Sequence, residues 1–151
     1  MVESVKDWRS AETIRPSVSA VIWRDGRLLL QKRADGGQWG LPGGSVEIGE
    51  SVTQAIRREV REETGFTVEV GHLVGVYSDP AFQVVRYPDG RVWHYVNLCF
   101  ECSILDGACE TSVETLALDF FNPDQFPVTL LPMHRIRIED ALTRKVEPFI
   151  R

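Results

Sequence analysis

The sequence predicts a single α+β domain in which a mixed β-sheet lies between α-helices. Three observations support this fold class: several segments are rich in β-branched residues, one segment has strong helical periodicity, and a second helical pattern lies near the end of the chain. The chain has 151 residues, 43% of them hydrophobic, which is enough to bury one core. One domain over residues 1–151 is therefore expected.

The N-terminal part is predicted to hold an extension, a β-hairpin and a glycine-rich loop. Residues 1–14 form the extension, and a short helix is one interpretation of its first nine residues. That helix would place three apolar side chains roughly on one side: Val2, Val5 and Trp8. Residues 17–33 predict a hairpin, because apolar residues alternate and Asp25–Gly26 supplies a turn. Residues 34–44 contain five glycines and a proline, which indicates a loop.

The C-terminal part predicts further strands and a last helix. Residues 66–78 are rich in β-branched side chains and predict a strand, and residues 79–105 predict a loop or hairpin that turns at the sequence YPDG. Residues 114–121 predict another strand whose alternate apolar side chains point inward, namely Leu116, Leu118 and Phe120. A final helix is predicted from Pro132 to about Lys145, with Ile138 and Leu142 on one face.

Composition excludes several classes of function. The net charge of −5 argues against a broad basic surface, so no long nucleic acid partner is expected. No segment has the pattern of a signal peptide or of a membrane span, so no membrane partner is expected and the cytoplasm is the expected compartment. Cys99 and Cys102 have a CxxC spacing, but they lie in an apolar run and no second CxxC exists. Buried thiols are the favoured interpretation over a zinc or redox site.

The strongest predicted helix carries three glutamates close together. It spans residues 51–64, with Ser51 as its cap and Gly65 as a left-handed terminator. On a helical wheel with Val52 at zero, Glu59 falls at about 340° and Glu63 at about 20°, inside the apolar stripe. Glu62 lies at the edge of this stripe.

The direction of these carboxylates bears on their role. A run of charges on a helix is usually a solvated face. Carboxylates that point toward the body of a protein must instead be paired or hold a metal, because burying a bare charge is costly. Arg58 can reach some of them, whereas Arg57 and Arg61 point away. The remaining oxygen-rich cluster is of the kind that Mg²⁺ or Mn²⁺ binds.

The helix and the preceding loop together match a specific motif. From Gly44 the spacing is Gly, five residues, Glu50, seven residues, Arg58-Glu59-Val60, one residue, Glu62-Glu63, one residue and Gly65-Phe66. A chance match to these nine positions at a given start occurs about once in a billion. The motif resembles the signature of the Nudix hydrolase family at every specified position.

This resemblance implies the Nudix fold, a mixed β-sheet sandwiched between α-helices. It also implies a pyrophosphohydrolase dependent on Mg²⁺ or Mn²⁺ that cleaves the diphosphate linkage of a nucleoside diphosphate derivative, such as a (d)NTP or ADP-ribose, by attack of metal-activated water. Carried over by position, it implies that three residues are catalytic and bind metal: Glu59, Glu62 and Glu63. It further implies that the Gly43 carbonyl is a metal ligand and that Glu50 braces Arg58.

The sequence leaves alternatives open for the general base, the function and the oligomeric state. The general base could be Glu62 or Glu63, or a glutamate from a later loop such as Glu110 or Glu114. A non-catalytic Nudix-fold module that senses nucleotides is the alternative function, and a purely structural or metal-buffering acidic helix is the third. A homodimer is a further open alternative, because dimers are common in the family that the chain resembles.

Four residues outside the motif are the principal candidates for substrate binding. Arg33 ends a predicted strand just before the glycine loop and could meet a phosphate. Arg86 could cover the ligand from the YPDG turn, as could Arg91 on its other side, although a surface turn position is the favoured interpretation for both. Trp93 and Tyr95 share one strand face, so one is expected in the core and the other could reach the pocket and stack on a base. Other aromatic candidates are Tyr77, Phe82 and Phe126. The three histidines, His72, His94 and His134, are interpreted as hydrogen-bonded or exposed residues rather than catalytic ones.

Overall fold

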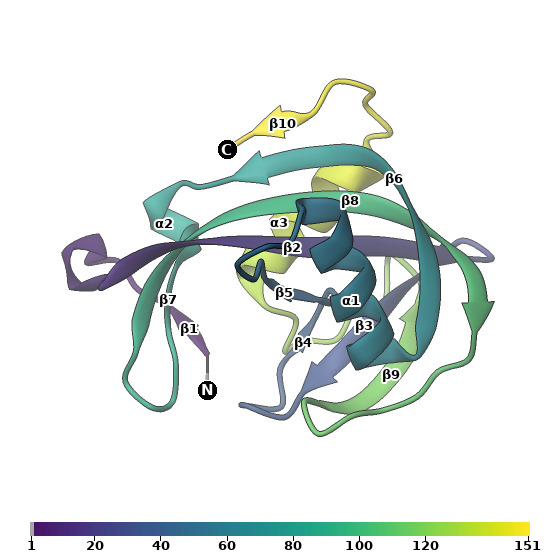
Figure 1. Ribbon diagram of the computed structural model, residues 1–151, viewed down its shortest axis with the longest axis horizontal. Coiled ribbons are helices and arrows are strands. Elements are labelled where there is room, and N and C mark those ends of the chain that lie inside the picture. Colours follow the sequence, from purple (N-terminus) through teal and green to yellow (C-terminus); the bar gives the residue numbers. More distant parts are fainter. Residues whose placement is uncertain (1) are drawn as a thin grey trace.

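The computed structural model describes residues 2–151, which form a mixed β-sheet with helices on both of its faces (Figure 1). This architecture confirms the predicted α+β fold class. The first residue of the predicted N-terminal extension lies outside the described residues. The helices are α1 (Val52–Thr64), α2 (Pro80–Gln83) and α3 (Pro132–Leu142), with a 3₁₀ turn η1 (Trp8–Ser10). The strands are β1 (Glu3–Ser4), β2 (Thr13–Arg24), β3 (Arg27–Arg33), β4 (Trp39–Gly40), β5 (Gly43–Ser45), β6 (Phe66–Tyr77), β7 (Val84–Arg86), β8 (Val92–Gly107), β9 (Thr115–Phe121) and β10 (Phe149–Ile150).

Two long parallel strands, β2 and β8, form the centre of the sheet. β8 also pairs antiparallel with β6 and β7, while β2 pairs antiparallel with β3 and β5. The sheet extends from β3 to β4 and β9, and from β7 to β1. The register places Ser17 beside Asn97 and Ser19 beside Cys99. Alternate residues of both central strands therefore point to the same face of the sheet.

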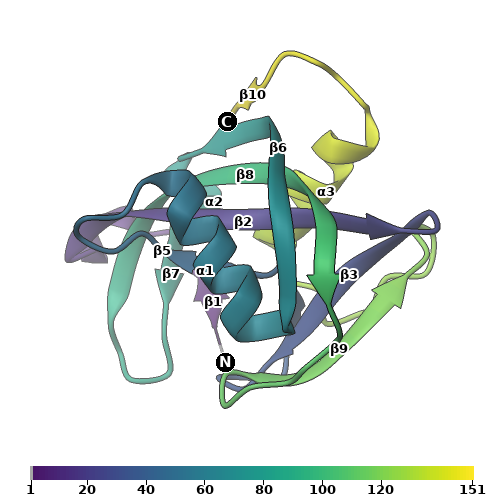
Figure 2. The same ribbon diagram turned by 45° about the vertical axis from the view of Figure 1, so that its right-hand side comes forward.

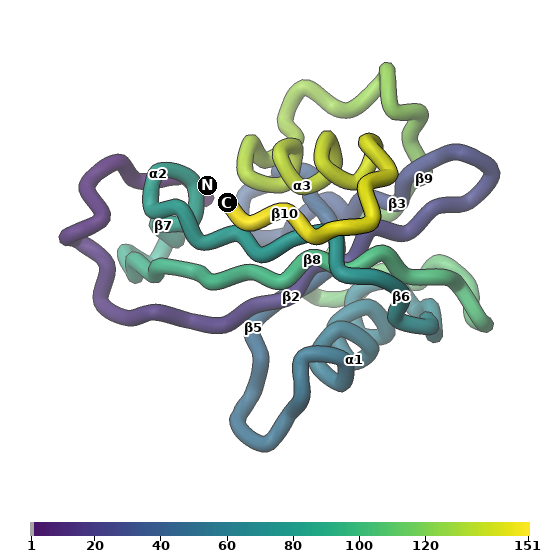
Figure 3. Tube along the Cα trace, turned by 90° about the horizontal axis from the view of Figure 1, so that it is seen from above, coloured from purple at the N-terminus to yellow at the C-terminus, as the bar shows by residue number. Residues whose placement is uncertain are grey.

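Different helices cover the two faces of the sheet (Figure 3). On one face α1 packs over an apolar cluster that includes Val18, Ala20 and Ile22. On the other face α3 packs over a cluster that includes Val21 and contributes Ile138 to it. Because both faces of β2 are covered, all of residues 17–22 are buried, as expected for a central strand between two layers.

Helix α1 begins and ends where the sequence predicts. The Ser51 side chain accepts a hydrogen bond from the Gln54 backbone N–H, and the Gln54 side chain accepts one from the Ser51 backbone N–H. Gly65 ends the helix with a φ of 80°, and a Cβ added there would lie 2.4 Å from the Ala108 carbonyl oxygen. Glycine is therefore required at this end both by conformation and by space.

Both predicted hairpins are present. Asp25 and Gly26 have φ values of 51° and 75°, the positive pair that a two-residue type I′ turn needs between β2 and β3. The second hairpin joins β7 to β8, and the Gly90 N–H donates to the Tyr87 carbonyl across its turn at 2.9 Å. Figure 2 shows this hairpin standing beside the N-terminal strand β1.

The interpretation of the first nine residues as a helix is wrong for the described part of that segment, residues 2–9. β1 pairs antiparallel with β7, and Val2 is buried against Val85 and Met133. Trp8 lies in the short turn η1, with about half of its surface exposed. The edge of β7 supplies backbone partners that a helix in this segment would not use, so tertiary pairing overrides the local periodicity.

Several details near the C-terminus also differ from the predictions. Leu116 is exposed, because a bulge pairs Thr115 with Arg33 and leaves Leu116 as the extra residue. α3 ends at Leu142, before the predicted Lys145, and Leu142 is itself exposed. The short helix α2 and the strand β10, which runs parallel to β6, were not predicted. None of the helices described for residues 2–151 has the length and apolar character needed to span a membrane.

Candidate active site

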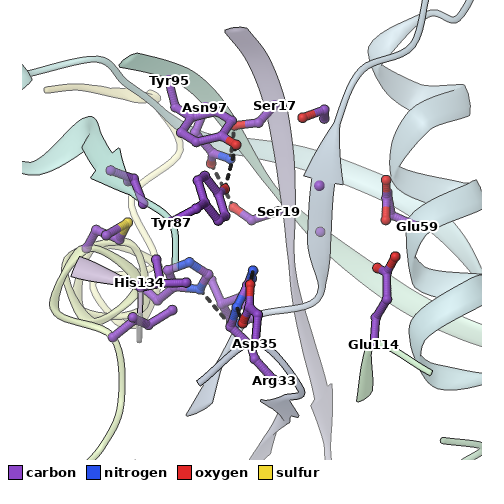
Figure 4. A pocket seen from close by; sticks show the side chains of 18 of the residues that line it. Ser17, Ser19, Arg33, Asp35, Glu59, Tyr87, Tyr95, Asn97, Glu114 and His134 are labelled. Atoms are coloured by element: carbon purple, nitrogen blue, oxygen red, sulfur yellow. Dashed lines mark hydrogen bonds and ion pairs between the residues drawn. The ribbon is translucent and has the colours of Figure 1, made fainter. Parts of the chain in front are cut away.

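A cavity of about 850 Å³ lies on the α3 side of the sheet, and its lining reaches across β5 to α1 (Figure 4). Alternate residues of β2 and β8 form its floor, and α3 forms the opposite wall. Glycines of β5 and glutamates of α1 border one end, while the turn between β7 and β8 borders another. This volume lies within the range of small-molecule and cofactor sites.

Two of the predicted glutamates are buried and border this cavity. Glu59 is 9% exposed and Glu63 is 5% exposed, as their wheel positions predict. Glu63 Oε2 accepts hydrogen bonds from Gln31 Nε2 at 2.5 Å and from the Gly43 backbone N–H at 3.1 Å. Glu114, from the loop before β9, lines the same side of the cavity as Glu59 (Figure 4). Burial raises the pKa of both Glu59 and Glu63, and their mutual repulsion raises the pKa of Glu63 further.

The glycines of β5 permit the close approach of the backbone to these carboxylates. A Cβ added at Gly44 would lie 2.5 Å from Glu59 Oε1, and one added at Gly43 would lie 2.1 Å from the Val18 carbonyl oxygen. At Gly43 the clash would be with the backbone of β2, which excludes a side chain, whereas at Gly44 the Glu59 carboxylate would have to move. The loop therefore lies against β2 at Gly43 and against the Glu59 side chain of α1 at Gly44.

Arg58 organises the outer side of the glutamate cluster. Its guanidinium donates to both carboxylate oxygens of Glu50, at 2.5 and 3.0 Å, and to Glu59 at 2.8 Å. It also lies 3.3 Å from Glu62 and donates to the Ser45 carbonyl at 3.2 Å. The hydrogen bond from Arg58 lowers the pKa of Glu50 to about 2. The structure thus contains the Glu50–Arg58 brace that the resemblance implies.

Glu62 differs from its two neighbours. Its side chain is 60% exposed and turns toward Arg58 on the surface, outside the cavity lining. Within residues 2–151, no three histidine, cysteine or acidic side chains are gathered closely enough to hold a metal ion. The structure therefore brings Glu59 and Glu63 together and leaves Glu62 one turn of helix beyond Glu59, at the edge.

The donor set nevertheless fits a divalent cation of the Mg²⁺ or Mn²⁺ type. Glu59 and Glu63 offer hard carboxylate oxygens, which these ions prefer. Glu63 accepts hydrogen bonds only from uncharged groups in the described part of the chain, so its carboxylate form would lack a close cationic partner until a cation binds. The missing Cβ of Gly44 also leaves backbone and carboxylate within reach of one ligand.

Three of the four predicted substrate-binding residues line the cavity: Arg33, Trp93 and Tyr95. The fourth, Arg86, lies on β7 outside the cavity lining, 3.8 Å from Glu3. Arg91, on the other side of the turn, lines the cavity in its place. Arg33 donates to both carboxylate oxygens of Asp35, at 2.7 and 2.9 Å, so its charge is already paired.

The aromatic side chains at the outer end of the cavity contact one another. Trp93 lies 5.3 Å from Tyr87 and 6.2 Å from Tyr95 between ring centroids, and the hydroxyls of the two tyrosines are 2.6 Å apart. The guanidinium groups of Arg15 and Arg91 lie 4.1 and 4.5 Å from the centre of the Trp93 ring. The expectation that one of Trp93 and Tyr95 is core and one reaches the pocket is therefore too simple, because both border the cavity.

The other residues considered from the sequence either lie outside the cavity lining or are held by contacts within the fold. Tyr77, Phe82, Phe126 and Glu110 do not line the cavity. His94 Nε2 hydrogen-bonds the Ser78 carbonyl at 2.7 Å, and His134 Nδ1 accepts from the Leu41 N–H at 2.8 Å. Burial lowers the pKa of His134 well below its usual value, so this histidine is neutral. Cys99 and Cys102 are buried in separate clusters, one on each face of the sheet, which leaves no place for a shared metal or disulfide.

Sequence reasoning missed the polar residues on the cavity floor and on α3. Ser17, Ser19 and Asn97 lie side by side on β2 and β8 and hydrogen-bond one another at 2.8 Å. Arg137 of α3 is buried opposite them. A lone polar residue in a predicted strand or helix has no distinctive spacing, so only the pairing of β2 with β8 brings these groups together.

Comparisons with known proteins agree with this geometry. The family model described as "NUDIX domain" matches residues 13–144. A "MutT-like protein" of Streptomyces ambofaciens is 39% identical over 127 residues, covering 83% of this chain and 75% of the relative. An "ADP-ribose pyrophosphatase" of Methanocaldococcus jannaschii is 35% identical over 114 residues, covering 74% of this chain and 63% of the relative. The chain thus spans three quarters of the length of the first curated relative and less than two thirds of the length of the second.

A solved structure shares the fold over nearly the whole chain. The crystal structure of a "UDP-X diphosphatase" superposes with a TM-score of 0.77 and 29% identity, covering 97% of this chain and 71% of the other. Two of these three proteins are named for different substrates, ADP-ribose and UDP-X, and the name of the MutT-like protein gives none.

Proposed function

Because the chain belongs to the Nudix hydrolase family, whose members act on phosphoanhydride bonds, we propose that it is a divalent-metal-dependent pyrophosphohydrolase of a nucleoside diphosphate derivative. One observation carries this proposal. Two buried glutamates of α1, Glu59 and Glu63, border a cavity of about 850 Å³ at the same end as the glycines of β5. A pyrophosphate at that end would leave room for a nucleoside over the floor of β2 and β8.

In this proposal the glutamates of α1 bind Mg²⁺ or Mn²⁺. Glu59 and Glu63 face the cavity, and Glu62 would join them after its side chain turns away from Arg58. A bound divalent cation supplies charge neutralisation of the pyrophosphate and lowers the pKa of a water molecule. The Gly43 carbonyl remains a candidate fourth ligand, because Gly43 lines the cavity beside Glu63.

The other residues of the site have tasks that need no metal. Glu50 and Arg58 hold the start of α1 against the glycine loop, since Arg58 bonds both Glu50 and the Ser45 carbonyl. Arg33 lines the cavity with its charge paired to Asp35 and would orient a phosphate oxygen. Glu114 is a better candidate than Glu110 for accepting the proton of the attacking water, because only Glu114 borders the cavity.

A metal-dependent turnover assay tests the proposal. The purified protein would be incubated with (d)NTPs, ADP-ribose, sugar nucleotides and dinucleotide polyphosphates, each with Mg²⁺, with Mn²⁺ and with chelator. We expect metal-dependent cleavage of one class, reduced by a hundredfold or more in Glu63→Gln, an order of magnitude typical for removing a catalytic group. The matched control is Glu69→Gln, which removes an exposed glutamate on β6 away from the cavity.

The alternative function makes a different prediction. A non-catalytic nucleotide-sensing module would bind one of these compounds and cleave none of them, with or without metal. That outcome, obtained with folded protein, would replace the hydrolase by the sensor.

A further inference from the structure

Arg137 is a buried arginine at the cavity that lacks a charged partner. It lines the cavity from α3 and is only 3% exposed. Its Nη2 donates to Gln83 Oε1 at 2.8 Å and its Nη1 lies 3.5 Å from Ser19 Oγ, while its Nε has no hydrogen-bond partner among the described residues. Three of the five guanidinium N–H groups are therefore free of protein partners in residues 2–151.

The lack of an ion-pair partner distinguishes Arg137 from the other arginines of the cavity lining. Arg33 pairs with Asp35 at 2.7 Å and Arg91 pairs with Asp89 at 2.6 Å. No carboxylate of the described chain lies within 4.0 Å of Arg137, whose two acceptors are both uncharged. Burial lowers the pKa of Arg137 to about 10, so the group is still a cation at neutral pH. Burying guanidinium N–H groups without hydrogen-bond acceptors is costly, which indicates that an acceptor on a ligand completes the site.

The neighbours of Arg137 add further hydrogen-bond donors. The Ser19 hydroxyl donates to Asn97 Oδ1 at 2.8 Å, and Asn97 Nδ2 donates to Ser17 Oγ at 2.8 Å. This chain of bonds leaves the second N–H of Asn97 and the Ser17 hydroxyl hydrogen to face a ligand. Together with the free N–H groups of Arg137 they form a donor-rich, positively charged subsite, suited to an oxygen that only accepts hydrogen bonds.

The aromatic side chains beside this subsite favour the nucleobase over the phosphates as its ligand. Asn97 follows Tyr95 by two residues on β8, so both side chains lie on the same face beside the aromatic cluster of Tyr87, Trp93 and Tyr95. On its other side the subsite adjoins β5, because Ser17 and Ser19 of β2 pair with Ser45 and Gly43, so the aromatic neighbours and the charge decide between base and phosphate. A phosphate would also bring up to two negative charges to a site that has one cation.

We propose that Arg137, with Asn97 and Ser17, binds a keto oxygen of the nucleobase and selects substrates with a uracil or hypoxanthine-type edge over those with a cytosine or adenine edge. This inference rests on the proposed function, because it names the base of the same nucleotide substrate. A keto oxygen accepts from the donors of the subsite, whereas the exocyclic amino group of cytosine or adenine would set donor against donor. Sites built to hydrogen-bond one substrate group reject an analogue that leaves those groups unpaired.

Equilibrium binding of nucleoside monophosphates in chelator tests the inference without hydrolysis. UMP and CMP form one pair and IMP and AMP form another, and within each pair the two bases are of similar size. By calorimetry we expect UMP and IMP to bind about tenfold or more tightly than CMP and AMP, in the range for a good bidentate contact. Arg137→Met should remove most of this preference, and Arg135→Met, which deletes an exposed arginine of the same helix, should retain it.

A second variant keeps the test independent of whether Arg137→Met folds. Asn97→Asp replaces a donor by an acceptor and should shift the preference toward CMP and AMP. Equal binding of the two members of each pair by the wild-type protein would overturn the inference, as would a loss of affinity in Arg137→Met that is the same for all four nucleotides. Base preference without any turnover in the substrate panel would leave this inference standing and refute the hydrolase. Turnover without base preference would refute this inference and leave the hydrolase standing.

Discussion

Replacing Glu63 by glutamine should stabilise the metal-free protein while it reduces hydrolysis by about a hundredfold or more. Both hydrogen bonds to Glu63, from Gln31 and from the Gly43 N–H, end on the same oxygen, Oε2. A glutamine can present its single carbonyl oxygen at that point and keep both bonds, and its NH₂ group then faces the cavity. The substitution therefore removes a carboxyl group whose ionisation burial disfavours, with little change of shape or hydrogen bonding.

The expected gain follows from the pKa of Glu63. Burial raises this pKa from 4.5 to about 8, so the folded state holds a proton that the unfolded state has lost. The stability of the wild-type protein must therefore fall as the pH rises from about 4.5 toward about 8. At pH 7 the cost is on the order of 3 kcal/mol, since each pKa unit corresponds to about 1.4 kcal/mol. Glu63→Gln should then raise Tm by roughly 6–12 °C, at 2–4 °C per kcal/mol for a chain of this size.

Thermal melts in chelator between pH 5 and pH 8.5 measure this effect. The difference in Tm between variant and wild type should be small at pH 5 and grow with pH. Glu62→Gln is the matched control, because Glu62 is 60% exposed and its contact with Arg58 is a surface pair, so its Tm should change little. A Glu63→Gln protein that is no more stable than wild type at pH 8 would refute the reasoning.

Four further predictions use simpler measurements. In Gly44→Ala the new Cβ would lie 2.5 Å from Glu59 Oε1, so kcat should fall about tenfold or more as the carboxylate shifts, and unchanged kcat would contradict the close approach. Wild type should lose stability as the pH falls from 4.5 toward about 2, because the hydrogen bond from Arg58 lowers the pKa of Glu50. In Glu50→Gln this loss should be smaller, and urea titrations that show the same loss in both proteins would contradict the reasoning. Millimolar Mg²⁺ should raise the Tm of wild type but not of the Glu59→Gln, Glu63→Gln double variant, and equal shifts would place the ion elsewhere. A thiol reagent should titrate one cysteine in native protein, the exposed Cys109, and three after denaturation; a second fast thiol would contradict the buried placement of the other two.

Much of the local structure around the site was predictable because it depends on neighbours in the chain. Ser51 and Gly65 bound α1 through hydrogen bonds to residues of the same helix, and Asp25–Gly26 makes a turn that needs only its own φ values. The wheel position of Glu59 and Glu63 predicted their burial for the same reason.

The errors share a cause in long-range pairing. The N-terminal segment has helical spacing, but β7 offers it an edge to pair with, and Val2 gains a buried position against Val85 and Met133. The exposure of Leu116 follows from one bulge opposite β3. Neither the edge nor the bulge leaves a pattern in the local sequence.

The sequence by itself determined the family motif, the helix that carries the glutamates, and the direction in which two of them point. These features follow from residue identity and from the fixed geometry of a helix turn. Only the tertiary structure decided that Glu62 lies on the surface with Arg58, that Arg91 rather than Arg86 borders the cavity, and that Arg137 is buried there without a counter-charge. These contacts depend on which strands become neighbours in the sheet. The parallel pairing of β2 with β8 joins segments that are far apart in the chain, so no local pattern in the sequence predicts it.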